Sequence, residues 1–524
     1  MTHRYRQGRH NDPSNAALDE RELDVEPILR HTFTGPSCPA PDGQRKRILI
    51  EATNSLTTTL NTGIQRVVRS VIREASFCEW LARCDSPAER DSFAQWDSLA
   101  KRDSYAERDW PVRCVPVVFR NGLFYDARTS LSRCERRLRR HAAAVRITRT
   151  AAGVCSRVHP SLGSLPERGI QRLRKILYPA TLMRQWDAYS WRAFGERIRF
   201  GPGDILLTLD ASWMYDIWPA LVAAQRRGCR IGAMFHDLIP IRYPEFCGQA
   251  HLDTFQAWLD AAVEHADFFL ANSQSTRDDV EDYVRSTHRG RRRPSDCFGS
   301  FRLGADFSSR GTPGRCRGEV KQAFAGDGSD RPYLVVGTIE PRKNHSYLLD
   351  AFELAWRRHP RIRLCLAGAI GWNCDSVVER IRRHPRFGRS LFLFDDLSDA
   401  ELQYAYRHAQ ALIMPSIAEG FGLPIVEALH LGLPVLASDT PIHREVGRDR
   451  CRYFELSDAS SLAATVEGLE QCRDLAATRA PSPFRPTTWA ESFRDLVERT
   501  LELALAADAE RDRRLMAPLH AAIA

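Results

Sequence analysis

The chain has 524 residues, more than one hydrophobic core usually organises, so its length predicts two large domains with additions. Apolar residues make up 43% of the chain, a fraction typical of globular proteins. The 75 lysines and arginines exceed the 66 acidic residues, which gives a formal net charge of +9. Since no run of about 18 apolar residues occurs, we expect no membrane-spanning helix.

The cysteine pattern indicates a reducing compartment. The 14 cysteines are scattered, without a C-x-x-C pair or a histidine cluster at zinc spacing, so we expect no structural metal. The first 45 residues are polar and lack the apolar segment of a cleaved signal peptide. We therefore expect a disordered leader over residues 1–45 and a cytoplasmic protein.

Residues 46–325 are predicted to form a first α/β domain, because short apolar runs of strand length alternate with segments of helical periodicity. A loop from Thr53 to Gly63 leads into a helix that starts near Ile64. The predicted strands are Arg47–Glu51, Val112–Phe119, Ile205–Leu209, Ile231–Phe235 and Phe268–Ala271.

Two insertions interrupt this alternation. Residues 85–108 repeat the six-residue unit Asp-Ser-x-Ala-x-Arg, which indicates a low-complexity surface segment to which we assign no function. Residues 130–200 are rich in arginine with interleaved apolar residues. This second insertion is either a solvated helical segment or a cationic surface that contacts the inner face of the cytoplasmic membrane or a phosphate-bearing acceptor.

A second domain is predicted over residues 331–480, after a polar, glycine-containing linker at residues 326–330. Its regular alternation of strands and helices specifies a parallel sheet covered on both faces. The predicted strands are Leu334–Val336, Leu364–Leu366, Leu391–Phe394, Ala411–Met414 and Val435–Ala437. The predicted helices are Leu348–Trp356, Val377–Ile381, Glu401–His408, Ile425–Leu431 and Leu462–Leu469, and residues 481–524 form a helical segment that crosses back to the first domain.

Two cations follow the first strand of the second domain. Arg342 and Lys343 lie just ahead of a helix amino end, where the helix dipole disfavours positive charge. A diphosphate would explain them, because arginine binds phosphate oxygens in a fork and lysine adds a point charge. For such a pair alone, two solvated surface cations would be the better interpretation.

The most informative motif is Pro415–Glu427, a glycine-rich turn between a strand and a helix with Glu419 and Glu427 eight positions apart. We place Glu427 in the first turn of the helix, where it suits a ribose diol, and Glu419 suits hydroxyls of a transferred sugar. The turn also contributes Gly420, Phe421, Gly422 and Leu423, whose backbone N–H groups can approach ligand oxygens closely. Because parallel strands end at one edge, the carboxylates and the cations converge on one nucleotide sugar.

These residues resemble the retaining, metal-independent glycosyltransferases of the GT-B fold, specifically glycosyltransferase family 4. The Glu-x7-Glu signature, the Arg342-Lys343 loop and the Gly-x-Pro-Val turn at residues 432–435 carry the resemblance, which covers most of residues 331–470. The resemblance implies two facing Rossmann-like domains with a cleft between them. It also implies that Arg342 and Lys343 hold the donor diphosphate, Glu419 the donor sugar and Glu427 the ribose.

The resemblance extends more thinly to the first domain. Gly63 lies in a segment that looks like the family's glycine loop, which faces the donor phosphates and the acceptor, although one glycine stands where many members have two. His236 follows a strand and could hydrogen-bond the donor sugar, and Asp237 could orient it or contact the acceptor. Asn272 and Ser273 match a family pattern without a defined role.

The site we expect therefore contains no metal. Asp395 and Asp396 could suggest one, but the Arg-Lys pair already neutralises a diphosphate, and we expect the two aspartates to begin a loop before a helix. The family pattern often has glycine near this position, and the chain departs from it. We expect no cofactor besides the donor substrate.

The sequence predicts a hexosyltransferase that acts on a growing, lipid-linked polysaccharide or O-antigen, with GDP-mannose favoured as the donor by analogy. The expected partners are the nucleotide sugar and the glycan acceptor, and not nucleic acid. A sugar-nucleotide epimerase and a scaffold that has lost turnover stay open as alternatives. A nicotinamide-binding enzyme is disfavoured because no G-x-G-x-x-G follows either domain's first strand. The donor base, the sugar, the linkage and the oligomeric state are left open.

Overall fold

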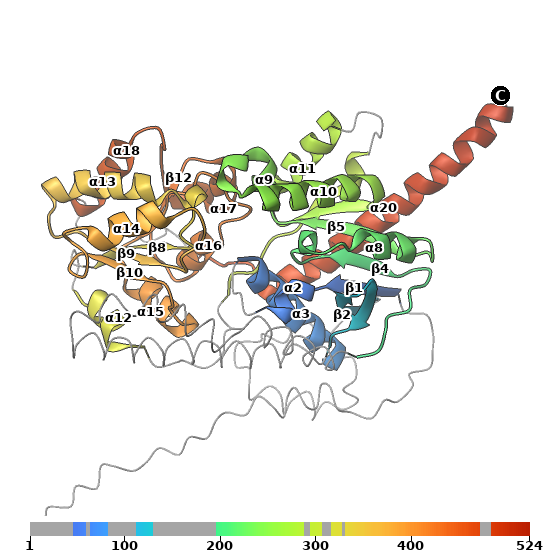
Figure 1. The fold of residues 1–524 in the computed structure, drawn as a ribbon, viewed down its shortest axis with the longest axis horizontal. Coiled ribbons are helices and arrows are strands. Elements are labelled where there is room, and N and C mark those ends of the chain that lie inside the picture. Colours follow the sequence, from blue (N-terminus) through green and yellow to red (C-terminus); the bar gives the residue numbers. More distant parts are fainter. Residues whose placement is uncertain are drawn as a thin grey trace, which may run out of the picture. The chain divides into compact units, whose positions relative to one another are not determined.

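The computed structural model describes residues 46–58, 63–81, 112–128, 195–287, 294–306, 316–326, 331–471 and 484–523 (Figure 1). The leader predicted over residues 1–45, the repeat at residues 85–108, the linker core at residues 327–330 and most of the arginine-rich insertion lie outside these ranges. Residues 44–524 form one compact unit, and it contains two sheets.

The first sheet has seven strands in the order β3-β2-β1-β4-β5-β6-β7. All neighbouring pairs are parallel except β2 and β3, which form an antiparallel hairpin at the edge. The five strands predicted for this region are confirmed, and the short β3 and β7 were not predicted. The strands are β1 (Lys46–Glu51), β2 (Val112–Arg120), β3 (Leu123–Asp126), β4 (Ile205–Thr208), β5 (Arg230–Phe235), β6 (Phe268–Ala271) and β7 (Phe298–Ser300).

The helix predicted to start near Ile64 is α3, which begins at Gly63. One difference is α2, which occupies part of the expected loop between Thr53 and Gly63. The helices are α2 (Thr53–Thr57), α3 (Gly63–Leu81), α8 (Trp218–Gln225), α9 (Ile239–Arg242), α10 (Gln249–His265) and α11 (Gln274–Thr287), with 3-10 turns η4 (Ser212–Met214), η5 (Pro244–Phe246) and η6 (Ser295–Cys297).

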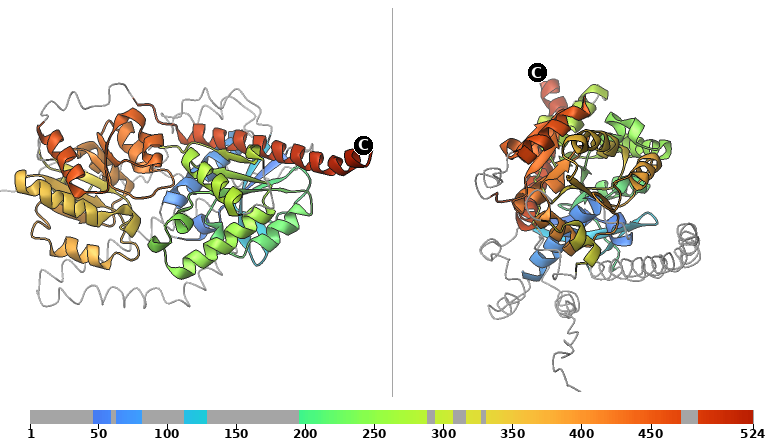
Figure 2. Two further views of the ribbon diagram at one scale, coloured as in Figure 1. Left: turned by 90° about the horizontal axis from the view of Figure 1, so that it is seen from above. Right: turned by 90° about the vertical axis from the view of Figure 1, so that its left-hand side faces the viewer.

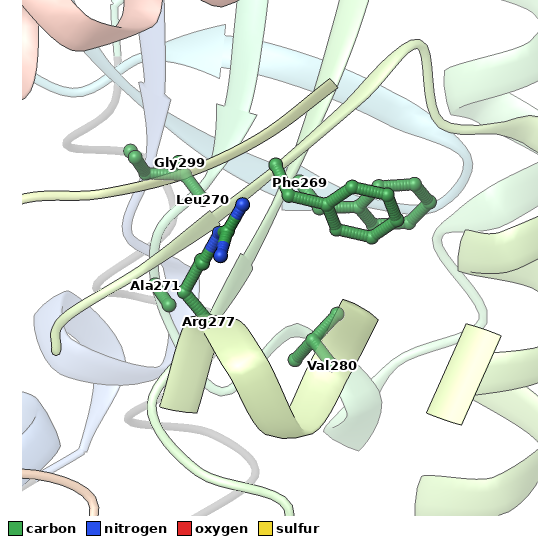
Figure 3. Close-up of a pocket in the computed structure, with 7 residues that line it drawn as sticks. Phe269, Leu270, Ala271, Arg277, Val280 and Gly299 are labelled. Carbon is green, nitrogen blue, oxygen red and sulfur yellow. The ribbon is translucent and has the colours of Figure 1, made fainter. Parts of the chain in front are cut away.

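Alternating side chains of β1 build two apolar layers, one on each face of the sheet. Ile48 and Ile50 pack with α3, whereas Leu49 packs with residues of α8, α10 and α11. Between α11 and strands β6 and β7, Phe269, Val280 and the stem of Arg277 line a narrow apolar crevice (Figure 3). The guanidinium of Arg277 is held by Glu281 at 2.8 Å, one helical turn away.

The second sheet has six parallel strands in the order β10-β9-β8-β11-β12-β13. Five of them are the predicted strands, and β13 at the edge was not predicted. The strands are β8 (Pro332–Val336), β9 (Arg363–Ala367), β10 (Leu391–Phe394), β11 (Leu412–Met414), β12 (Val435–Ser438) and β13 (Cys451–Phe454).

Helices cover both faces of the second sheet. Helices α13 and α18 share one apolar cluster with Tyr333 and Val335 of β8, and α12, α15 and α16 share another with Leu334 and Val336. The five predicted helices are confirmed. The helices are α12 (Gly318–Ala323), α13 (His345–Arg358), α14 (Asp375–Arg383), α15 (Asp399–His408), α16 (Leu423–His430), α17 (Pro441–Gly447) and α18 (Ala459–Gln471), with 3-10 turns η9 (Pro341–Lys343) and η10 (Arg448–Arg450).

The chain ends in a long helix, α20 (Trp489–Ile523), which returns to the first sheet (Figure 2). Its residues Phe493 and Leu496 are buried in the apolar cluster that contains β1 and α3. The backbone N–H of Trp489 donates to Asp306 at 2.6 Å, which fixes the start of the helix. The predicted return of the last segment to the first half of the chain is thus confirmed. None of the helices in the described ranges is both long and apolar enough to cross a membrane.

Candidate active site

The predicted cations lie at the carboxyl edge of the second sheet. Strand β8 ends at Val336, and Arg342 and Lys343 close the 3-10 turn η9, directly before α13. Gly337 adopts a positive φ of +152°, and a side chain there would lie 3.3 Å from the Lys343 Nζ atom. The glycine thus leaves room for Lys343 to reach across the strand end.

Arg342, Lys343 and Glu419 form one ion-paired cluster. The Arg342 guanidinium contacts Glu419 at 2.7 Å and Glu340 at 2.6 Å, and the Lys343 ammonium pairs with the other oxygen of Glu419. The Ile417 N–H donates to the Arg342 carbonyl at 2.8 Å, so the two loops are also joined through the backbone. The structure therefore brings together the cations and one of the two predicted carboxylates.

The electrostatics of this cluster favour a charged carboxylate. Burial would raise the pKa of Glu419, but the charges of Lys343 and Arg342 outweigh it and hold that pKa far below its ordinary value. Burial also lowers the pKa of Lys343, which Glu419 opposes. The cations are the more exposed members, with side-chain exposures of 21% for Arg342 and 10% for Lys343 against 7% for Glu419.

Glu427 lies in a different surrounding. Helix α16 begins at Leu423, so Glu427 is one residue beyond the first turn where we predicted it, and that prediction is wrong. Its side chain is fully buried, one oxygen pairs with Arg66 of α3 and the other accepts a hydrogen bond of 2.8 Å from the Tyr406 hydroxyl. A ribose diol would have to replace one of these two partners.

The glycine-rich turn also packs against the first sheet. A side chain at Gly420 would lie 1.9 Å from the His236 carbonyl oxygen, so only glycine allows this approach. The Ser273 hydroxyl donates to the Gly420 carbonyl at 2.8 Å, and Phe421 and Leu423 join the apolar cluster around β1. No hydrogen bond in the described ranges uses the N–H groups of Phe421 or Gly422.

His236 and Asp237 lie at the end of β5, next to this turn. The His236 Nε2 atom donates to the Leu209 carbonyl at 2.8 Å, because a carbonyl can only accept, and burial lowers the pKa of the ring. His236 is thus neutral, with Nδ1 as its acceptor. The Asp237 carboxylate accepts from the Ile239 N–H at 3.0 Å, at the start of the short helix α9.

The other residues predicted in the first half, Gly63 and Asn272, make few contacts in the structure. Gly63 opens α3 and is exposed, with nothing within 4 Å of a side chain placed there. The Asn272 side-chain oxygen is buried without a hydrogen-bond partner among the described residues. Arg66, three residues after Gly63, is the member of this segment that reaches the Glu419–Glu427 motif, and the sequence analysis assigned it no role.

His443 of α17 is a second residue that the sequence analysis missed. Its Nδ1 atom lies 3.0 Å from the Ser438 carbonyl and must donate to it, so the Nε2 atom of the neutral ring is an acceptor. That atom is buried without a partner in the described structure and would lie 4.0 Å from a side chain at Gly422. Burial lowers the pKa of His443, and the charge of Glu419 opposes this. The ring of His443 therefore packs next to Gly422 of the glycine-rich turn.

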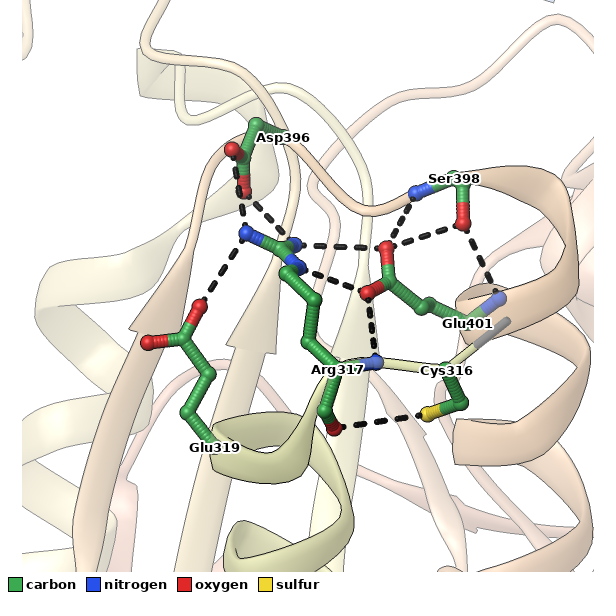
Figure 4. Close-up of polar contacts among 6 residues, drawn as sticks. All are labelled: Cys316, Arg317, Glu319, Asp396, Ser398 and Glu401. Carbon is green, nitrogen blue, oxygen red and sulfur yellow. Dashed lines mark hydrogen bonds and ion pairs between the residues drawn. The ribbon is translucent and has the colours of Figure 1, made fainter. Parts of the chain in front are cut away.

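Asp396 is engaged in a structural ion pair (Figure 4). Arg317 contacts Asp396 at 2.9 Å, Glu401 at 2.6 Å and Glu319 at 3.1 Å, which joins the β10–α15 loop to the start of α12. Ser398 and Glu401 form a capping box at the start of α15. The two aspartates begin the loop before this helix, as expected. Among the described residues, no group of three or more metal-binding side chains is clustered.

The carboxyl edge of the first sheet holds a buried carboxylate pair. Glu51 at the end of β1 accepts from the Thr53 N–H at 2.7 Å and the Ser212 hydroxyl at 2.6 Å. Asp210, just past β4, accepts from the N–H and the hydroxyl of Ser55. Burial and the neighbouring charge of Glu51 raise the pKa of Asp210 to about 7. The pair fixes α2, which precedes the segment containing Gly63.

This pair predicts a specific pH dependence of stability. The pKa of Asp210 is raised from 3.8 to about 7 in the folded protein, so its ionisation makes folding less favourable as the pH rises through this range. Between pH 5 and pH 8, the free energy of unfolding of the wild type should therefore fall relative to that of Asp210→Asn. Urea titrations at a series of pH values measure both. Asp278→Asn, at an exposed position, serves as the control. Parallel curves for wild type and Asp210→Asn would contradict the assignment.

Two family models match the chain, one over part of the first sheet and one over all of the second. Residues 136–290 match the model described as Glycosyltransferase Family 4, and residues 317–480 match that described as Glycosyl transferases group 1. The two matched segments are thus similar to glycosyltransferase domains, and the two Rossmann-like sheets agree with a GT-B fold. Parts of the chain are similar to bacterial O-antigen mannosyltransferases.

The curated relatives carry mannosyltransferase names. The chain is 33% identical over 278 residues to the serotype-specific mannosyltransferase WbdA of Escherichia coli, which is 52% of this chain and 34% of that protein. It is 28% identical over 262 residues to O-antigen chain mannosyltransferase B of Escherichia coli, covering 49% of this chain and 66% of that protein. The chain thus spans about a third of the length of the first of these relatives.

Solved structures with a similar arrangement are more distant in sequence. The N-terminal domain of Candida albicans trehalose-6-phosphate phosphatase aligns with a TM-score of 0.48 and 14% identity, over 88% of this chain and 98% of that one. The Anabaena protein HepE in complex with UDP and glucose aligns with a TM-score of 0.44 and 14% identity, over 90% of this chain and 99% of that one.

Proposed function

We propose that the protein is a retaining, metal-independent glycosyltransferase that moves a hexose, with mannose favoured, from a nucleotide diphosphate sugar to a lipid-linked polysaccharide. The observation that carries this proposal is the cluster of Arg342, Lys343 and Glu419 at the carboxyl edge of the second sheet. Such an edge is where open α/β sheets bind nucleotides. The mannosyltransferase names of the curated relatives support the choice of sugar.

The cations stabilise the leaving group in this mechanism. Arg342 and Lys343 turn from Glu419 toward the diphosphate as the bond between the anomeric carbon and the phosphate oxygen breaks. The acceptor hydroxyl attacks from the same face, and its proton passes to the departing phosphate oxygen. No side chain has to form a covalent intermediate, and the two cations meet the negative charge that develops on the diphosphate.

Glu419 first pairs with the two cations and then binds the donor sugar. Its carboxylate holds the cations in the unliganded protein and accepts hydrogen bonds from donor-sugar hydroxyls once the cations contact phosphate. The N–H groups of Phe421 and Gly422 are available to the donor beside it. The backbone of His236 lies against the same turn, and the Nδ1 atom of its neutral ring can accept a hydrogen bond from the sugar.

Glu427 binds the ribose in exchange for Arg66. The ribose hydroxyls donate to the Glu427 oxygen that Arg66 now occupies, while the Tyr406 hydroxyl keeps the other oxygen in place. Release of Arg66 also breaks the ion pair between α3, in the first half of the chain, and α16, in the second. Donor binding is thereby coupled to movement of α3. GDP-mannose is the donor that we favour, and no cofactor or metal is required.

A thermal-shift panel tests the donor class. The protein is incubated with GDP, UDP, dTDP and their sugar conjugates in buffer with a chelator, because a ligand that binds only the folded state raises the Tm. We expect GDP and GDP-mannose to raise the Tm at concentrations well above Kd. At least one of the other nucleotides should leave the Tm unchanged and so serve as the negative control. If no nucleotide raises the Tm of the folded protein, the proposed function fails.

A further inference from the structure

A few large apolar side chains are exposed in the part of the chain that the structure describes. Five large apolar residues in the described ranges are more than a third exposed, and they are Met214, Ile370, Trp372, Phe387 and Leu505. Met214 follows β4, and Ile370 and Trp372 follow β9, so three of the five lie beyond the carboxyl ends of strands. Trp372 is 48% exposed, which is unusual for a residue that normally buries most of its large surface.

The loop that carries Trp372 is joined to the loop that carries the cations. The Gly371 N–H donates to the Ile339 carbonyl at 3.0 Å, and the Ile339 N–H donates to the Ala369 carbonyl at 2.8 Å. A side chain at Gly371 would lie 3.5 Å from the Glu340 Cβ atom. Since Glu340 pairs with Arg342 at 2.6 Å, Trp372 is held beside the cation cluster.

Trp372 also reaches the first half of the chain. Its indole N–H donates to the Phe246 carbonyl of η5 at 2.8 Å. The Phe246 ring stacks on Tyr243 with centroids 5.7 Å apart and planes 13° apart, and both residues are partly exposed. The adjoining Cys247 is within electrostatic range of Asp237, Glu340 and Arg342. Aromatic rings from both halves therefore border the cluster.

This arrangement suits a sugar ring. The one polar atom of the indole is already satisfied, so the exposed surface of Trp372 is an apolar aromatic face. A pyranose presents one apolar C–H face to such a ring and keeps its hydroxyls for polar neighbours such as Asp237. Sites that combine aromatic walls with a few convergent polar groups are typical of small-molecule binding.

We propose that Trp372, with the stacked pair Tyr243 and Phe246, forms a subsite for the acceptor glycan, one that binds a pyranose ring of the chain being extended. The donor is accounted for by Arg342, Lys343 and the Glu419–Glu427 turn, and Trp372 lies beside that cluster on the path to η5. The assignment rests on the proposed function, because it takes the acceptor to be a carbohydrate.

Calorimetric titration with a linear α-linked mannose tetrasaccharide tests this subsite, since binding can be measured without turnover. We expect Trp372→Ala to weaken binding about tenfold, a loss typical of truncating an aromatic contact residue, and Trp372→Phe to retain most of it. Phe387→Ala is the matched control, because Phe387 is 40% exposed in the segment before β10, at the amino edge of the sheet. GDP affinity should be the same in all three variants.

The outcomes separate this inference from the proposed function. Wild-type protein that binds GDP but binds the tetrasaccharide no better than Trp372→Ala overturns the subsite and leaves the donor site standing. A loss of GDP affinity in Trp372→Ala equal to the loss of glycan affinity also overturns it, because the residue would then act on the donor. A thermal melt of Trp372→Ala within a degree or two of the wild type verifies that the variant is folded.

Discussion

Replacing Lys343 with alanine is expected to lower kcat/KM for sugar transfer by about 100- to 1,000-fold, the usual effect of removing one preorganised group that stabilises transition-state charge. Lys343 is buried, its ammonium pairs with Glu419, and it is placed to meet a departing diphosphate. Steady-state kinetics with GDP-mannose and a mannose oligosaccharide measures the effect. The variant should remain folded, because Arg342 still pairs with Glu419.

Lys321 provides the matched control for this substitution. It is an exposed lysine on α12, in the same half of the chain, and Lys321→Ala should leave kcat/KM unchanged. Lys343→Arg should restore part of the lost rate, since it returns the positive charge in a different shape. Wild-type kinetics in Lys343→Ala would remove the cation cluster from the mechanism.

Replacing Arg66 with alanine should reduce the free energy of unfolding by about 3 kcal/mol, because loss of one partner leaves a buried charge unpaired. Glu427 is fully buried, and in the variant it keeps the hydrogen bond from the Tyr406 hydroxyl but loses the charge of Arg66. Chemical denaturation monitored by circular dichroism gives the measurement.

The double variant Arg66→Ala/Glu427→Ala distinguishes an unpaired charge from lost packing. Removing both charges should recover stability relative to Arg66→Ala alone, since the buried carboxylate is gone. The exposed pair Arg499 and Glu502 on α20 serves for comparison, and Arg499→Ala should change stability by less than about 1 kcal/mol. A double variant no more stable than the single one would contradict this account of Glu427.

The fold could be predicted closely because most strands are continuous apolar runs buried on both faces. β6 (Phe268–Ala271), which is buried throughout, and the partly buried edge strand β10 (Leu391–Phe394) have the predicted boundaries, since each apolar run is bounded by polar residues. The missed strands β3, β7 and β13 all lie at sheet edges. β7 has three residues and β13 includes an exposed arginine, so neither gives a clear pattern of burial.

The site residues could be predicted where a short stretch of sequence places them directly after a strand. Glu419, Arg342 and Lys343 follow strands of one sheet, and the order of parallel strands requires their loops to meet. Arg66 and Trp372 gave no such signal, because their partners Glu427 and Phe246 are 361 and 126 residues away in the chain. Such contacts depend on how the two halves pack, which local sequence patterns do not encode.

The pairing of the predicted ligands with each other could not be foreseen either. The sequence analysis assigned the carboxylates to sugar hydroxyls and the cations to phosphate, and the structure pairs Glu419 with both cations and Glu427 with Arg66. Without a ligand, opposite charges at one sheet edge satisfy each other, since leaving them buried and unpaired would be more costly. The assigned roles in donor binding stay predictions.

The most direct test of the central claim is the stereochemistry of the product made from GDP-α-mannose and a mannose oligosaccharide, with a chelator present. Nuclear magnetic resonance of the anomeric position distinguishes the two linkages by their one-bond carbon–hydrogen coupling. We predict an α-linked product, formed with release of GDP and without added metal. A β-linked product, or folded protein that binds GDP and transfers no sugar, would contradict the proposal of a retaining transferase.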